Sequence, residues 1–94
     1  MSDTHRQRAR ARIGDLVVRL KQIGAVDGRE ALVEEAESLG RAIDAFHMEA
    51  IRFRMFNVDR QLQRLPGGPP ADAVAIFGEA REALEAAGFH TRSH

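Results

Sequence analysis

Apolar residues recur along this chain at spacings of three and four, which is the period of one face of an α-helix. The segments that show the pattern are residues 4–23, 28–65 and 70–87. Gly24, Pro66 and Gly88 follow these segments, and glycine or proline directly after an apolar pattern is a common helix stop. The sequence therefore predicts an all-α protein of three helices in a single domain, 1–94, in which a long central helix has two shorter antiparallel neighbours.

The predicted central helix carries two apolar stripes rather than one. The first stripe is Leu32, Ala36, Leu39, Ile43, Phe46, Ala50 and Phe53, and the second is Met48, Ile51, Met55, Val58, Leu62 and Leu65. At about 100° per residue, the centres of the two stripes lie more than about 100° apart. Because short turns make neighbouring helices antiparallel, residues 4–23 are expected along the first half of the long helix and residues 70–87 along the second. Gly40 interrupts the first half, either as a close helix contact or as a kink.

The two stripes overlap in the middle of the long helix, which is then apolar on most of its circumference. Two short helices cannot cover such a surface, so the sequence predicts a helical-bundle or coiled-coil-like oligomer, with a homodimer favoured. The predicted interface anchors are Phe46, Met48, Phe53, Met55 and Phe56, and the residues predicted to set its register are His47, Arg54 and Asn57.

The amino-acid composition argues against several classes of function. The 14 Lys and Arg residues balance the 14 Asp and Glu residues, which argues against wholesale binding of a polyanion. Cysteine is absent, so disulfides and thiolate metal ligands are excluded. No apolar run approaches the roughly 20 residues that span a bilayer, and no apolar segment follows the arginine-rich start as a secretory signal requires. A cytoplasmic location without membrane contact is expected, with residues 1–8 and 90–94 the least ordered.

One constellation suggests a metal site. Asp44 and His47 are three residues apart, which places a carboxylate and an imidazole on one helix face, as in di-iron bundles. Glu49 lies close in sequence, and an antiparallel layout brings His90 toward the same region, so these four residues form a candidate site for a divalent ion. The alternative is that His47 belongs to a polar seam with Arg54, of the kind that fixes register in helix pairing.

A second constellation is the basic N-terminal arm, which consists of Arg6, Arg8, Arg10 and Arg12. Arginines in this arrangement could grip phosphates in a salt-dependent way. The arm has no interleaved aromatic residue for base stacking, so nucleic-acid binding is not favoured. The alternative is an arm that is solvated or paired with the acidic half of the long helix.

The sequence contains no catalytic motif: it has no phosphate loop, nucleophile elbow or HExxH, so neither an enzyme nor a cofactor is expected. The function expected from the sequence is therefore a non-catalytic oligomerisation, adaptor or regulatory protein that acts through protein–protein contacts. A nucleic-acid-binding regulator that uses the arginine arm is the alternative, and a metal-binding helical bundle is the second alternative.

Overall fold

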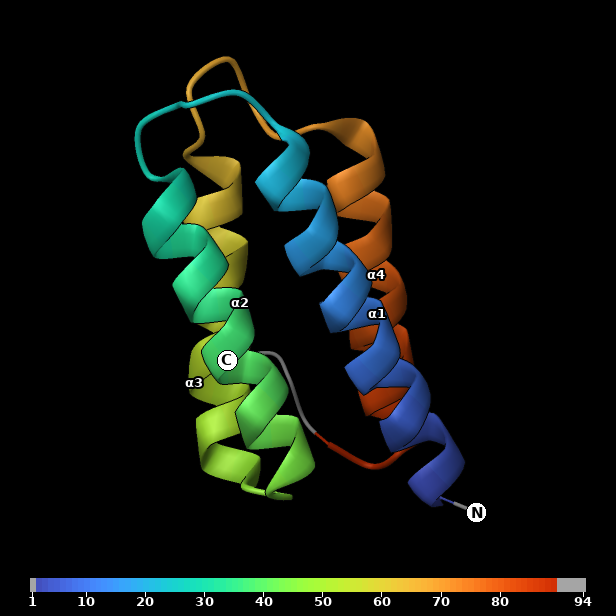
Figure 1. The fold of residues 1–94 in the computed structure, drawn as a ribbon. Helices are drawn as coiled ribbons and strands as arrows, with labels where there is room; N and C mark the ends of the chain where they lie inside the picture. Colours follow the sequence, from blue (N-terminus) through green and yellow to red (C-terminus); the bar gives the residue numbers. More distant parts are fainter. Residues whose placement is uncertain (1, 90–94) are drawn as a thin grey trace.

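The structure is a computed structural model that describes residues 2–89. Four helices make up this part of the chain: α1 (Ser2–Gln22), α2 (Arg29–Asp44), α3 (Met48–Gln63) and α4 (Ala71–Ala86). They run alternately up and down, so that each helix is antiparallel to the next (Figure 1). The all-α prediction is confirmed, and the first and last helices lie close to their predicted bounds.

The prediction of one long helix over residues 28–65 is wrong, because the chain reverses at Phe46. The backbone of Phe46 is left-handed, with φ 56°. The N–H of Phe46 donates to the carbonyl of Ile43, and the N–H of His47 donates to that of Ala42, both at 3.2 Å. These paired bonds form a Schellman motif, which satisfies the carbonyls at the end of α2 and stops the helix. A phenylalanine thus occupies the position where glycine is usual.

His47 starts the next helix in the same turn. Its backbone is extended and its side chain caps α3: Nδ1 accepts a hydrogen bond from the N–H of Ala50 at 3.1 Å. A residue at this position must accept from one of the free N–H groups of the first turn, a task that serine, threonine, aspartate or asparagine usually performs. One helix therefore ends and another begins within three residues that contain neither glycine nor proline.

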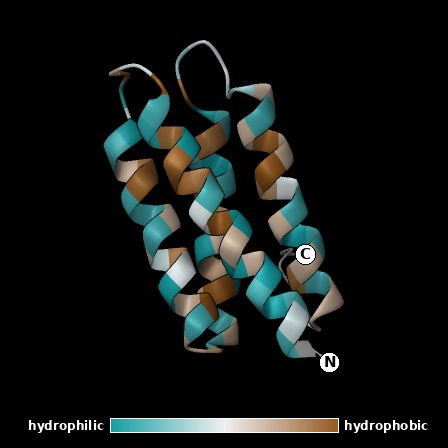
Figure 2. Cartoon of the chain, turned by 45° about the vertical axis from the view of Figure 1, so that its right-hand side comes forward, coloured by the Kyte–Doolittle hydropathy of each residue, from teal (hydrophilic) through white to brown (hydrophobic). Residues whose placement is uncertain are grey.

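The break explains why the segment carries two apolar stripes. Folding α3 back onto α2 brings the α2 part of the first stripe and most of the second stripe onto one core, although they lie on different sides of a continuous helix. Phe46 and Phe53 of the first stripe and Met48 of the second stay exposed. Leu39 and Ile43 from the first stripe and Met55 and Val58 from the second are all fully buried in the same cluster. Apolar residues recur along each helix between polar ones (Figure 2).

Helix α1 is central to the packing. It lies in close backbone contact with both α2 and α4, and α3 packs closely against α2. The predicted position of the last helix, along the second half of the long helix, is therefore wrong: α4 lies mainly along α1. Ala73, Ala80 and Ala83 of α4 are all fully buried, and small side chains allow two helix axes to approach closely.

Ion pairs reinforce the contact between α1 and α4. Arg19 Nε donates to Asp72 at 2.7 Å, and Arg12 Nη2 lies 2.8 Å from Glu79. The hydrogen bond from Arg19 lowers the pKa of the Asp72 carboxyl below its ordinary value. Both carboxylates are solvent-exposed, so these pairs contribute orientation more than stability.

Gly40 is a close helix contact inside α2, which continues through it to Asp44. The guanidinium of Arg10 from α1 lies over this glycine, and a Cβ at position 40 would come within 2.7 Å of Arg10 Nη1. Arg10 then reaches Asp44, to which its Nε donates at 3.0 Å. The missing side chain therefore makes room for a cation that ties α1 to the end of α2.

Candidate functional site

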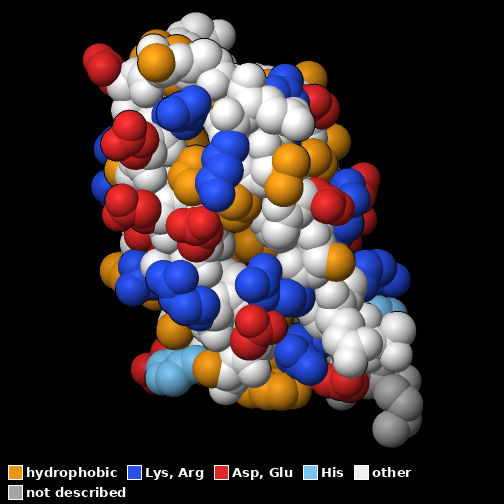
Figure 3. Space-filling model, in the orientation of Figure 1, with side chains coloured by type: hydrophobic (Ala, Val, Ile, Leu, Met, Phe, Trp, Pro, Cys, Tyr) orange, Lys and Arg blue, Asp and Glu red, His pale blue; other side chains and the backbone are white. Residues whose placement is uncertain are grey.

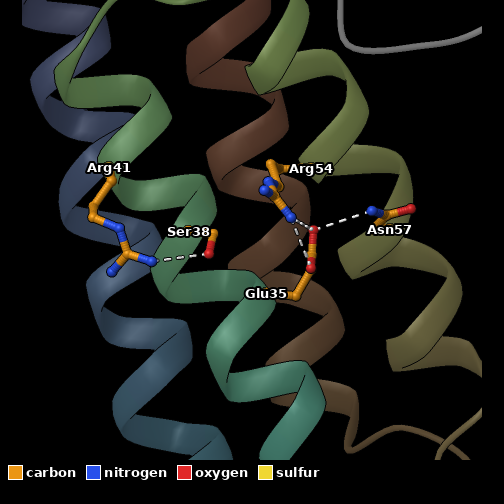
Figure 4. A network of polar contacts seen from close by, with 5 residues as sticks. All are labelled: Glu35, Ser38, Arg41, Arg54 and Asn57. Carbon is orange, nitrogen blue, oxygen red and sulfur yellow. Dashed lines mark hydrogen bonds and ion pairs between the residues drawn. The ribbon is translucent and has the colours of Figure 1, made fainter.

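A polar cluster joins α2 to α3. Arg54 Nη1 donates to both carboxylate oxygens of Glu35, at 3.1 and 2.9 Å, and Asn57 Nδ2 donates to Glu35 Oε2 at 3.1 Å (Figure 4). The side chain of Glu35 is only 14% exposed, so the three hydrogen bonds compensate a largely desolvated charge. Within α2, Arg41 donates to Ser38 in the same region, without contact to this cluster.

The cluster fixes how α3 lies on α2 within one chain. Arg54 and Asn57 were predicted to set the register of a dimer, and the structure shows them bound to Glu35 of the same chain. His47 caps α3. The helical spacing identified these residues as a polar seam, but Glu35 was missed as their partner because it lies opposite them only once the chain reverses at Phe46.

The side of α3 that faces away from the core carries two half-exposed phenylalanines. Phe53 is 59% exposed and Phe56 is 46% exposed. Together with Glu49 and Arg52 they line a shallow depression of about 310 Å³. Arg60 follows Phe56 by one helical turn on the same side. We call these five residues the outer face of α3.

Arginines stack on the exposed rings. The Arg60 guanidinium lies 5.6 Å from the centroid of the Phe56 ring, and that of Arg54 lies 5.5 Å from the Phe53 ring. Such contacts are worth about 0.5–1 kcal/mol at exposed sites, less than full burial of an aromatic side chain. The rings therefore keep apolar surface that a partner could cover, in a composition of phenylalanine and arginine that is enriched at interfaces.

The remaining predicted anchors divide into two groups. Phe46, at the turn, and Met48, at the start of α3, are both exposed. The Phe46 ring is covered on one side by Arg6, whose guanidinium lies 4.2 Å from its centroid. Met55 is fully buried in the core of its own chain and therefore offers no surface to a partner.

The arginine arm forms the first turns of α1 and is largely engaged within the chain. Arg6 pairs with Asp3 at 2.7 Å, Arg10 with Asp44 at 3.0 Å, and Arg12 with Glu79. Arg8 is exposed and has no ion pair within residues 2–89. Basic and acidic side chains are intermixed over the face that α1 and α2 form (Figure 3). Within residues 2–89, Arg10 alone of these arginines pairs with the acidic half of the predicted long helix, whereas Arg6 and Arg12 pair with carboxylates of α1 and α4.

The candidate metal ligands do not converge in the part of the chain that the structure describes. No group of three or more His, Asp or Glu residues in residues 2–89 is arranged to hold a metal ion. Asp44 binds Arg10 instead, and His47 uses Nδ1 as a helix cap. His90, the fourth predicted ligand, lies outside the described residues.

Comparison with protein-family models, with curated proteins and with solved structures gives no match for this chain. No helix within residues 2–89 is both long enough and apolar enough to cross a membrane. Among the surfaces described above, the outer face of α3 carries two of the three exposed phenylalanines of residues 2–89, and the function is inferred from it.

Proposed function

We propose that this protein is a non-catalytic oligomerisation module of an adaptor or regulatory kind, which acts through contacts made by the outer face of α3. The observation that carries the proposal is the placement of Phe53 and Phe56. Both rings point away from a core that is already filled on the opposite side of α3 by Ile51, Met55 and Val58. About half of each side chain therefore lies outside the packing of its own chain.

Self-association is the use of this surface that the physical argument favours. A chain of 94 residues buries a modest fraction of its surface alone, and a second copy adds apolar burial. In a twofold dimer the same patch is buried on both chains, so each exposed phenylalanine contributes buried apolar surface from both chains. Clusters of exposed aromatic residues on a small protein commonly mark such contacts.

Substitution of Phe53 by aspartate tests the proposal. We expect Phe53→Asp to raise the dimer dissociation constant at least about tenfold, because each dimer loses two apolar contacts and gains two desolvated carboxylates. Light scattering over a concentration series measures the change.

Val18→Asp is the matched control, because Val18 is a similarly exposed apolar residue, 57% accessible, on α1. It should leave the dimer intact. The proposal is contradicted if the two variants behave alike, whether both dimerise as the unsubstituted protein does or both remain monomeric. Circular dichroism should show the same helix content in all three proteins.

A further inference from the structure

Opposite charges flank the two phenylalanines on the outer face of α3, and Arg52 lies beside them. Glu49 lies four residues before Phe53, and Arg60 lies four residues after Phe56. The spacings of four, three and four residues place these side chains on one narrow strip of the helix, the pattern of a coiled-coil seam. The strip thus has an acidic end, two aromatic rings and a basic end.

A strip of this kind is complementary to a second copy of itself in only one orientation. When two copies lie antiparallel, Phe53 of each chain faces Phe56 of the other, and Glu49 faces Arg60. A parallel arrangement would instead place Glu49 against Glu49 and Arg60 against Arg60, which costs free energy because like charges repel. Neither residue has an ion pair within residues 2–89 of its own chain, so both charges are available.

We infer that the partner of the outer face of α3 is a second copy of this chain, paired antiparallel about a twofold axis that passes between Phe53 and Phe56. The inference rests on the proposed function and adds to it the orientation and the register. In the dimer, Arg60 leaves the Phe56 ring of its own chain and pairs with Glu49 of the other. The contact is isologous, so it closes at two chains.

Charge reversal tests the register. In an antiparallel dimer, Glu49→Arg alone and Arg60→Glu alone each create two repulsive pairs, and each should raise the dissociation constant about tenfold at low salt. The double variant restores two attractive pairs and should dimerise as the unsubstituted protein does. An equimolar mixture of the two single variants should form a heterodimer in preference to either homodimer. High salt should reduce all of these differences, because it screens exposed charges.

Cysteine cross-linking provides a second measurement, for which a chain without native cysteine is a clean background. Positions 49 and 60 are eleven residues apart, about 16 Å along a helix. In the antiparallel register position 49 faces position 60 of the other chain, so the two copies of position 49 are about 16 Å apart, too far for a disulfide. Glu49→Cys mixed with Arg60→Cys should therefore give a disulfide-linked heterodimer, whereas neither variant should cross-link to itself.

The outcomes separate the register from the proposed function. Self-cross-linking of Glu49→Cys, or single charge reversals that leave the dissociation constant unchanged, overturn the antiparallel register. If Phe53→Asp still raises the dissociation constant in that case, the outer face of α3 remains the contact surface. Both proposals are overturned if the unsubstituted protein is monomeric at all concentrations. Binding of a different protein would then be the remaining use of this face.

Discussion

Phe46 adopts a left-handed backbone conformation, with φ 56°, that glycine adopts without strain and that other L-residues adopt at a cost of about 1–2 kcal/mol. Its ring is exposed apart from the contact with Arg6, so little side-chain burial offsets this cost. The position is held instead by the two hydrogen bonds that end α2 and by the cap that begins α3. The turn is therefore imposed on Phe46 by the helices on either side of it.

Glycine at position 46 should relieve this strain. We expect Phe46→Gly to unfold with a free energy about 1 kcal/mol higher than Phe46→Ala, because alanine also removes the ring but keeps the Cβ that opposes positive φ. Comparing the two variants cancels the loss of the Arg6 contact, which both share. Urea denaturation followed by circular dichroism measures the difference. Equal stability of the two variants would contradict the left-handed turn.

Helix α2 is joined to α1 by the placement of a guanidinium over a glycine. Arg10 occupies the space above Gly40 and pairs with Asp44 beyond it. Gly40 weakens the helix by about 1 kcal/mol relative to alanine, so the contact is maintained at the expense of helix propensity. The exposed Arg10–Asp44 pair is worth about 0–1 kcal/mol, and the two contributions nearly cancel.

A double-mutant cycle tests this contact. Gly40→Ala should change the free energy of unfolding little in the unsubstituted protein, because the helix gain is offset when Cβ displaces the Arg10 guanidinium. In an Arg10→Ala background the same substitution should stabilise the fold by about 1 kcal/mol. Thermal or chemical denaturation of the four proteins measures the coupling. Identical effects of Gly40→Ala in both backgrounds would argue against the close approach.

The α1–α4 contact should weaken in acid. The hydrogen bond from Arg19 lowers the pKa of Asp72 in the folded chain below the unfolded value of about 3.9. The ionised carboxylate therefore stabilises the fold above that value, and the contribution is lost as pH falls through the folded-state pKa. The difference in free energy of unfolding between the unsubstituted protein and Asp72→Asn should be constant near neutral pH. It should decline as the pH falls through the folded-state pKa of Asp72.

Glu82→Gln is the control for this pH dependence, because Glu82 is an exposed carboxylate of α4 with no ion pair within residues 2–89. Its stability difference from the unsubstituted protein should show no comparable decline. A difference for Asp72→Asn that does not change across the acid range would contradict the hydrogen bond with Arg19. Denaturant titrations at several pH values supply the measurement.

The helices themselves were largely predictable, but the reversal at Phe46 was not. Spacing, Gly24 and Gly88 identified α1 and α4 because each carries one stripe and a glycine stop. Over residues 28–65 the local signals favour helix throughout, since no glycine, proline or asparagine marks the turn. The available signal was the two stripes on different faces: one straight helix cannot bury both against one core, whereas two antiparallel helices can.

At the scale of the whole molecule, the four helices fill one core and leave an aromatic surface outside it. The exposure of Phe53 could be predicted from the sequence only in part. The first stripe groups Phe53 with Ile43, but Ile43 is buried and Phe53 is exposed. Phe56 lies outside both stripes, and it was predicted as an interface anchor because it belongs to the apolar middle of the predicted long helix. The partners of Arg54 and Asn57 could not be predicted, because they depend on how α3 folds back onto α2.

The molar mass of the untagged protein in solution decides whether two chains pair through the outer face of α3. Light scattering over a concentration series at moderate and high salt should give twice the 10.4 kDa of the chain at the upper concentrations. The dimer should persist at high salt, because the Phe53 and Phe56 contacts are apolar and are not screened. A mass of one chain at all concentrations would contradict the account and leave the outer face of α3 without a partner of its own kind.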